Sequence, residues 1–152
     1  MRPNVHIIFG IFFAFLIYFI FSQISLIGLL IIFFSSVLID VDHYFYYFIR
    51  TKNLNLTKCY SWYDAHLRKI LSLPMSGRKK AYTGFYLFHG IEWLTILFLL
   101  SKFVFPNFIF LFIGFLLHWI IDAPHEYYIK RTLHKSSLIY NYMQWKKLVR
   151  KN

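Results

Sequence analysis

Residues 24–43 read Ile-Ser-Leu-Ile-Gly-Leu-Leu-Ile-Ile-Phe-Phe-Ser-Ser-Val-Leu-Ile-Asp-Val-Asp-His, an apolar run that ends in two acids and a histidine. A helix needs about 20 mostly apolar residues to cross the hydrocarbon core of a bilayer. Tyr44, Tyr46 and Tyr47 follow the run, as in the aromatic belt at a membrane surface. This stretch therefore predicts a membrane helix whose polar end lies at the surface.

Three further apolar runs cover residues 5–21, 85–105 and 108–123. Of the 152 residues, 59% are hydrophobic and 15% are charged, whereas a soluble domain carries about a quarter charged residues. These values exclude an ordinary soluble globule. They predict an all-α integral membrane protein, a single membrane domain over residues 1–152 with four transmembrane helices.

The segments outside these runs are basic. Residues 50–84 carry eight Lys and Arg, and apolar residues recur at helical spacing up to Pro74. This pattern predicts an amphipathic helix over 60–73 that lies on the bilayer. The tail, residues 124–152, is also basic and amphipathic, so the same interfacial position is expected for it.

The distribution of basic residues predicts the orientation. With four spans, the two termini and the 50–84 loop share one side and hold 16 of the 17 Lys and Arg, whereas Lys102 is near the other side. Positive residues favour the cytoplasmic side, so we expect a multi-pass protein of the cell (inner) membrane with both termini in the cytoplasm. The net charge of +11 fits anionic lipid head groups as partners, and no nucleic acid is expected.

Most of the acids and histidines fall at matching ends of the predicted spans. Because consecutive spans alternate in direction, the start of the first and third spans and the end of the second and fourth lie at one depth. A lone cysteine, Cys59, excludes an internal disulfide and a Cys-based metal site. The candidate metal ligands are His6, Asp40, Asp42, His43, His89, Glu92, His118 and Asp122.

The spacing of these residues favours a shared site. His89 and Glu92 are three residues apart and His118 and Asp122 four, so each pair is expected on one helix face. Carboxylates near a bilayer are costly unless they are paired or bind metal, and together with histidine they suit zinc, manganese or iron. Asp42 lies two residues from Asp40, and joins the same site only if the helix unwinds at its end.

Other polar residues have more than one interpretation. The presence of any one histidine at a span end is explained by a hydrogen bond to a neighbouring helix at least as readily as by metal binding. His125 and Glu126 are as readily explained by hydration beyond the fourth span. His66 belongs to a basic amphipathic segment, which favours a solvated position.

At these residues the sequence resembles the YdjM-like family of small inner-membrane proteins, described as metal-dependent hydrolases. The matches are His6, the run from Leu38 to His43, His89, and His118 with Asp122. Two positions depart from the family pattern: Ile39 replaces a proline, and the central motif is reduced to His89-Gly90-Ile91-Glu92. The resemblance covers roughly residues 6–125 and implies a hydrolase.

The residues and the resemblance together predict a metal-dependent hydrolase at the cytoplasmic membrane face. One or two divalent metal ions would activate a water, and a carboxylate not needed as a ligand, Glu92 or Asp42, would act as the general base. The basic segments favour a phospholipid or a phosphorylated amphiphile as substrate. The alternatives are a metal-ion or proton transporter and a non-catalytic structural membrane protein, and the sequence sets neither the metal nor the oligomeric state.

Overall fold

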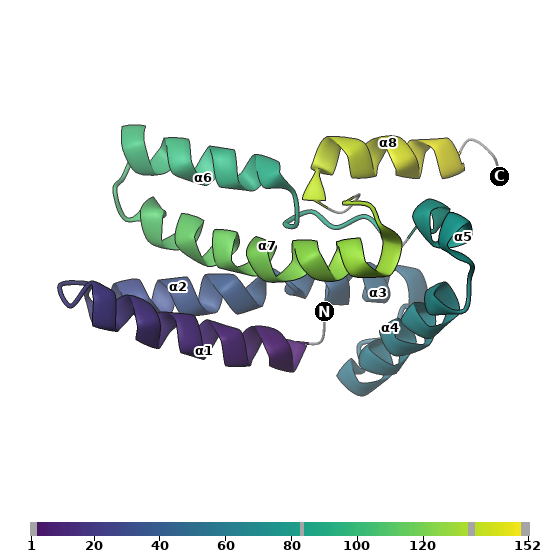
Figure 1. Cartoon of the computed structure of the whole chain (residues 1–152), viewed down its shortest axis with the longest axis horizontal. Helices are drawn as coiled ribbons and strands as arrows, with labels where there is room; N and C mark the ends of the chain where they lie inside the picture. Colours follow the sequence, from purple (N-terminus) through teal and green to yellow (C-terminus); the bar gives the residue numbers. More distant parts are fainter. Residues whose placement is uncertain (1–2, 83, 134–135, 150–152) are drawn as a thin grey trace.

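The computed structural model describes residues 3–82, 84–133 and 136–149, and every regular element within these ranges is a helix (Figure 1). The predicted all-α class is therefore confirmed. The helices are α1 (Pro3–Ile20), α2 (Leu26–Leu38), α3 (Val41–Thr51), α4 (Leu56–Leu71), α5 (Met75–Lys80), α6 (Ile91–Phe103), α7 (Phe108–Lys130) and α8 (Leu138–Val149).

Four apolar helices form the body of the molecule. Helix α2 packs against α1 and α7, and α6 packs on α7 (Figure 1). Small residues let α2 and α7 approach closely, because a Cβ placed on Gly114 would lie 2.6 Å from the carbonyl oxygen of Ile32. Such close contacts between small residues are typical of helix pairs in membranes.

Two of these helices are long and apolar enough to cross a membrane. One is the nearly continuous stretch Leu26–Thr51, with 26 residues, and the other is α7, with 23. Helices α1 and α6 are shorter, with 18 and 13 residues. Large side chains on the outside of the bundle are exposed, among them Phe19 at 79% and Phe103 at 82%.

Two predicted boundaries are wrong. The span predicted over 85–105 becomes helical only at Ile91, because the described residues from Gly84 to Gly90 form an irregular segment. The span predicted to end at residue 123 continues through Pro124 to Lys130. His89 therefore lies in an irregular segment before α6, whereas His118 and Asp122 lie on the continuous helix α7.

The junction between α2 and α3 is tightened rather than broken. Ile39 and Asp40 keep helical dihedral angles, but the N–H of Asp42 donates to the carbonyl of Ile39 and that of His43 to Asp40. These bonds connect residues three apart instead of four, which turns the backbone more sharply at this point. Asp40 and Asp42 are both directed from this junction toward the site.

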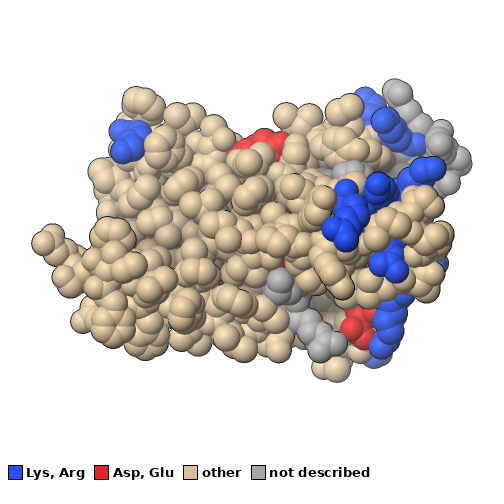
Figure 2. All heavy atoms as spheres, in the orientation of Figure 1, with Lys and Arg blue, Asp and Glu red and all other residues tan. Residues whose placement is uncertain are grey.

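The remaining helices gather at one end of the bundle. Helix α4, whose first turn is capped by Asn55, is the helix predicted over 60–73, and it starts four residues earlier and ends before Pro74. Most Lys and Arg on the face drawn in Figure 2 lie at this end, whereas the rest of that face is almost uncharged. Helix α8 covers part of the predicted tail, and residues 150–152 lie outside the described residues.

Candidate metal centre

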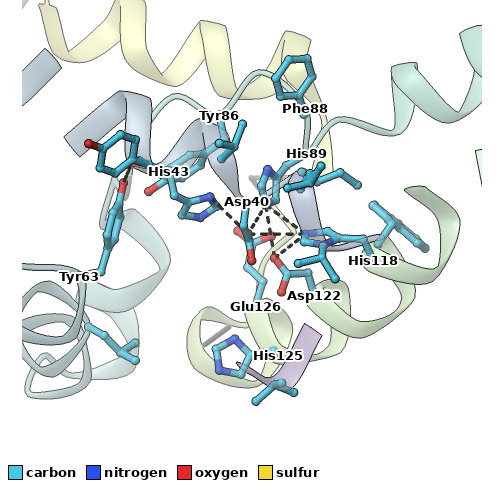
Figure 3. Close-up of a pocket in the computed structure, with 18 of the residues that line it drawn as sticks. Asp40, His43, Tyr63, Tyr86, Phe88, His89, His118, Asp122, His125 and Glu126 are labelled. Atoms are coloured by element: carbon cyan, nitrogen blue, oxygen red, sulfur yellow. Dashed lines mark hydrogen bonds and ion pairs between the residues drawn. The ribbon is translucent and has the colours of Figure 1, made fainter. Parts of the chain in front are cut away.

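Four predicted ligands meet at the basic end of the bundle. One ligand atom from each of His6, Asp40, His118 and Asp122 lies within 4.8 Å of the others. They come from α1, from the α2–α3 junction and from α7. Figure 3 labels Asp40, His118 and Asp122. The sequence prediction that matching span ends bring these side chains together agrees with this geometry.

The two histidines of this group are among the most buried large side chains. His6 is 1% exposed, and its ring stacks on His118 with the ring centres 4.2 Å apart. Nδ1 of His118 lies 2.8 Å from the carbonyl oxygen of Ser36, so this nitrogen is the donor and Nε2 is directed into the group. His6 Nε2 lies 3.2 Å from Asp122 and 3.6 Å from Asp40.

A second group overlaps the first. Asp40, His43 and His89 also present ligand atoms within 4.8 Å of one another. Nε2 of His89 lies 3.4 Å from Asp40 and 3.3 Å from Nε2 of His118. Two lone-pair nitrogens at this separation repel each other unless a proton or a cation lies between them. Asp40 belongs to both groups and therefore links them.

Asp42 positions ligands, which differs from its predicted roles as ligand and base. One oxygen lies 2.9 Å from Nδ1 of His43, and the other lies 3.1 Å from Nδ1 of His89 and accepts from the N–H of Phe88. Asp42 belongs to neither metal-sized group of the described residues. At His89 this contact leaves Nε2 facing Asp40, and a carboxylate on the far nitrogen of a histidine fixes which nitrogen faces the metal. At His43 the same Nδ1 also lies 3.5 Å from Asp40, so the two carboxylates share this nitrogen.

Buried polar atoms without hydrogen-bond partners show whether the cluster around Asp40 suits a cation. Among the described residues, neither ring nitrogen of His6 nor Oδ2 of Asp40 has a hydrogen-bond partner, although all three atoms are buried. Leaving such atoms without partners is costly. A divalent metal would satisfy Nε2 of His6 and Oδ2 of Asp40. A set of histidines and carboxylates without thiolates suits zinc, manganese or iron.

Glu92 belongs to neither metal-sized group of the described residues, which differs from its predicted roles as ligand and general base. Its carboxylate accepts hydrogen bonds from the hydroxyl of Ser137 and from the N–H groups of Leu138 and Ile139. Glu92 therefore caps the first turn of α8 from another helix. The predicted shared face with His89 fails because His89 precedes α6 and lies in the irregular segment.

Replacement of Glu92 by glutamine should test this assignment. A charged carboxylate at a helix N-terminus stabilises by about 1 kcal/mol, so Glu92→Gln is expected to lower the midpoint of thermal unfolding by a few degrees. Because Glu92 belongs to neither metal-sized group of the described residues, the content of bound metal should stay at the wild-type value. A variant that loses metal while its unfolding midpoint is unchanged would contradict the capping role.

The cluster opens onto a chamber of about 1010 Å³. One wall is α4, and the other walls include Val5, Leu94, Phe115 and Trp119, so most of the lining is apolar. Tyr63 of α4 donates its hydroxyl proton to the carbonyl oxygen of His43, and burial raises the pKa of Tyr63 well above its usual range. This tyrosine therefore stays a donor at neutral pH and ties α4 to the cluster.

Three contributors to the site were missed from the sequence. The carbonyl of Ser36 is a backbone group, which leaves no residue-type signal. Tyr86, 1% exposed, stacks on His43 with the ring centres 4.0 Å apart, and was interpreted as part of a membrane span. Lys130 lines the chamber, and its position four residues after Glu126 and eight after Asp122 was an available signal.

Comparison with protein-family models, with curated proteins and with solved structures finds no match for this chain. The resemblance to the YdjM-like family therefore stays a prediction that rests on the quoted residues.

Proposed function

We propose that this protein is a membrane-bound metal-dependent hydrolase whose site faces the cytoplasmic side. The observation that carries the proposal is a buried His/Asp cluster with unsatisfied ligand atoms at the wall of a large, mostly apolar chamber. Polar packing alone would leave Nε2 of His6 beside the carboxylates of Asp40 and Asp122, at 3.6 and 3.2 Å, without a hydrogen bond to either. The resemblance to the YdjM-like family points to the same class of activity.

The membrane part of the proposal has four crossings, by α1, α2, α6 and α7. Helix α7 is long enough by itself, and α2 is long enough together with α3, over Leu26–Thr51. Helix α1, with 18 residues, spans about 27 Å at 1.5 Å per residue. Helix α6 is about 20 Å long and needs a local thinning of the bilayer or a shallow position. The apolar outer faces of the bundle and the basic end support this placement.

Reporter fusions should test the orientation. A reporter inserted near Gly77, in α5, is expected to report the cytoplasm, and one at Pro106, between α6 and α7, the opposite side. The reason is the concentration of Lys and Arg at the α4–α5 end, which the positive-inside bias keeps in the cytoplasm. The same compartment for both insertions would show that α6 does not cross.

In the proposed reaction the side chains of the cluster hold the metal ion, orient its histidine ligands and deprotonate the attacking water. His6, Asp40, His118 and Asp122 would hold one ion, and His43 and His89 extend the set around Asp40. A divalent metal bound there supplies a water of lowered pKa and polarises the scissile bond. Asp42 keeps His89 in the ligating orientation.

Glu126 replaces Glu92 as the candidate general base. It lies one helical turn beyond Asp122 on α7, is 8% exposed and lines the chamber. Figure 3 shows Glu126 on the same side of α7 as Asp122, near the cluster. A carboxylate in this position can accept the proton of the attacking water and pass it to the leaving group.

The chamber favours an amphiphilic substrate. Its apolar lining suits a hydrocarbon chain, whereas the cluster at its wall suits a phosphoester or another hydrolysable ester. We therefore propose a phospholipid or a phosphorylated amphiphile that enters from the cytoplasmic leaflet. The transporter and structural alternatives predict no hydrolysis of such lipids.

Metal analysis of the full chain, purified in a mild detergent, tests the proposal first. We expect one or two divalent ions per chain, and metal-dependent release of product from a panel of phospholipids that chelation abolishes. Protein without metal, and without metal uptake after dialysis against zinc or manganese, would overturn the hydrolase assignment. Bound metal with no hydrolysis across the panel would favour transport.

A further inference from the structure

The chamber has a second polar end, formed around Lys130. The side chain of Lys130 lines the chamber although it is only 4% exposed, and its Nζ donates to the carbonyl oxygen of Ala81. A buried ammonium group is costly unless charged or polar partners surround it. A cation held inside a substrate chamber is therefore a candidate for substrate recognition.

Another residue of the chamber lining, His66, has a buried polar atom without a hydrogen-bond partner. His66 of α4 lines the same chamber as Lys130 and has a buried Nε2. Among the described residues, this nitrogen and the hydroxyls of Tyr82 and Thr132 have no hydrogen-bond partner. A buried cation and an unsatisfied nitrogen in the lining of one chamber suit a ligand rich in oxygens.

The order of residues along α7 relates this end to the metal cluster. His118, Asp122, Glu126 and Lys130 follow one another at four-residue spacing, and all four line the chamber. At 1.5 Å per residue, Lys130 lies about 12 Å beyond Asp122 along the helix. One extended ligand in the chamber can therefore contact both ends.

We propose that Lys130 and His66 form an oxyanion subsite that holds a second anionic group, a phosphate or a carboxylate, of the amphiphilic substrate. The inference rests on the proposed function for the reaction at the cluster, but binding at the subsite requires no metal. The competing explanation is structural, because Glu126 lies one turn before Lys130, and a Glu–Lys pair at this spacing stabilises a helix.

The test measures binding of lysophosphatidic acid to the full chain in neutral detergent after the metal is removed with a chelator. Monoacylglycerol with the same acyl chain is the uncharged reference. The wild-type protein should bind the phosphorylated lipid at least tenfold more tightly than the reference. Equal affinities would overturn the proposal without any variant. Inorganic phosphate bound as tightly as the lipid would also overturn it, because the anion would then belong to a small ligand.

Variants of Lys130 separate recognition of the anionic lipid from an ion pair with Glu126 within α7. Lys130→Met should lose the tenfold preference, whereas Lys130→Arg should keep it. Lys102→Met removes one charge at the far end of α6 and serves as the matched control, with the preference unchanged. In the double variant Glu126→Gln with Lys130→Met, recovery of the preference would show that Lys130 only neutralises Glu126.

His66 gives an independent arm, since it lies on α4 and is half-buried. His66→Phe keeps a ring against Trp62, which His66 stacks on with centres 5.6 Å apart, but removes both nitrogens. The preference should fall at least threefold, and an unchanged value would overturn the role of His66. The loss caused by Lys130→Met should persist in a His118→Ala background, and its disappearance there would place the anion at the cluster instead.

The outcomes for the two proposals are distinguishable. A protein that binds metal and hydrolyses lipids but shows no preference for the phosphorylated probe refutes the subsite alone. A protein that shows the preference but neither binds metal nor hydrolyses lipids refutes the hydrolase alone.

Discussion

Replacement of Asp40 by asparagine is expected to remove bound metal and hydrolysis together. Asp40 belongs to both metal-sized groups, so this single change weakens every position that an ion can occupy. Loss of an orienting partner alone costs about 10- to 100-fold in metal affinity, and loss of a shared ligand should cost at least ~100-fold. Metal content after gel filtration and the rate of lipid hydrolysis are the measurements.

Asp64→Asn is the matched control, because Asp64 pairs with Arg68 at 2.8 Å on α4. It makes the same chemical change outside the cluster, so wild-type metal content is expected. His89→Ala and Asp122→Asn should behave like Asp40→Asn. Retention of full metal content in all three variants would refute a common centre, and so would metal loss confined to one of them.

Replacement of Gly114 by alanine is expected to destabilise the whole bundle. The added Cβ would overlap with Oγ of Ser35 and lie 2.6 Å from the carbonyl oxygen of Ile32, and a backbone carbonyl cannot rotate away. Overpacking of this kind costs roughly 1–3 kcal/mol or more. We expect the upper part of that range, measured as the loss in unfolding free energy in detergent.

The effect should extend to the site, since His118 lies one turn beyond Gly114 and its Nδ1 bonds the carbonyl of Ser36 on α2. Separation of α2 and α7 would lengthen this bond and weaken metal binding. Gly77→Ala is the control, because a Cβ at Gly77 would make only ordinary contacts, the nearest at 3.4 Å. Equal stability of the two variants would show that the close approach of α2 and α7 is not needed.

The apolar helices could be predicted because hydropathy is a property of whole segments. The runs 5–21 and 24–43 correspond to α1 and to α2 with the start of α3. Hydropathy did not locate the start of α6, since the residues before Ile91 are apolar but irregular. Nor did it locate the end of α7, where polar residues continue a helix inside the protein.

The candidate site could be predicted as far as residue type and depth determine it. His6, Asp40, His118 and Asp122 lie together because antiparallel helices bring matching ends to one level. The shared face of His89 and Glu92 was predicted wrongly because a three-residue spacing has meaning only within a helix, and His89 precedes α6. The role of Asp42 depends on the tightened turn after α2. The sequence predicted only that Asp42 could join Asp40 if the helix changed its winding at this point.

The stacking of His6 on His118 also has a consequence for biogenesis. The two rings belong to α1 and α7, and five helices separate them along the chain. During synthesis the first ring emerges long before its partner, so no ion can be held by both until α7 has been inserted. Bound metal would then report completed assembly, because only a chain in which α1 has packed beside α7 can retain the ion.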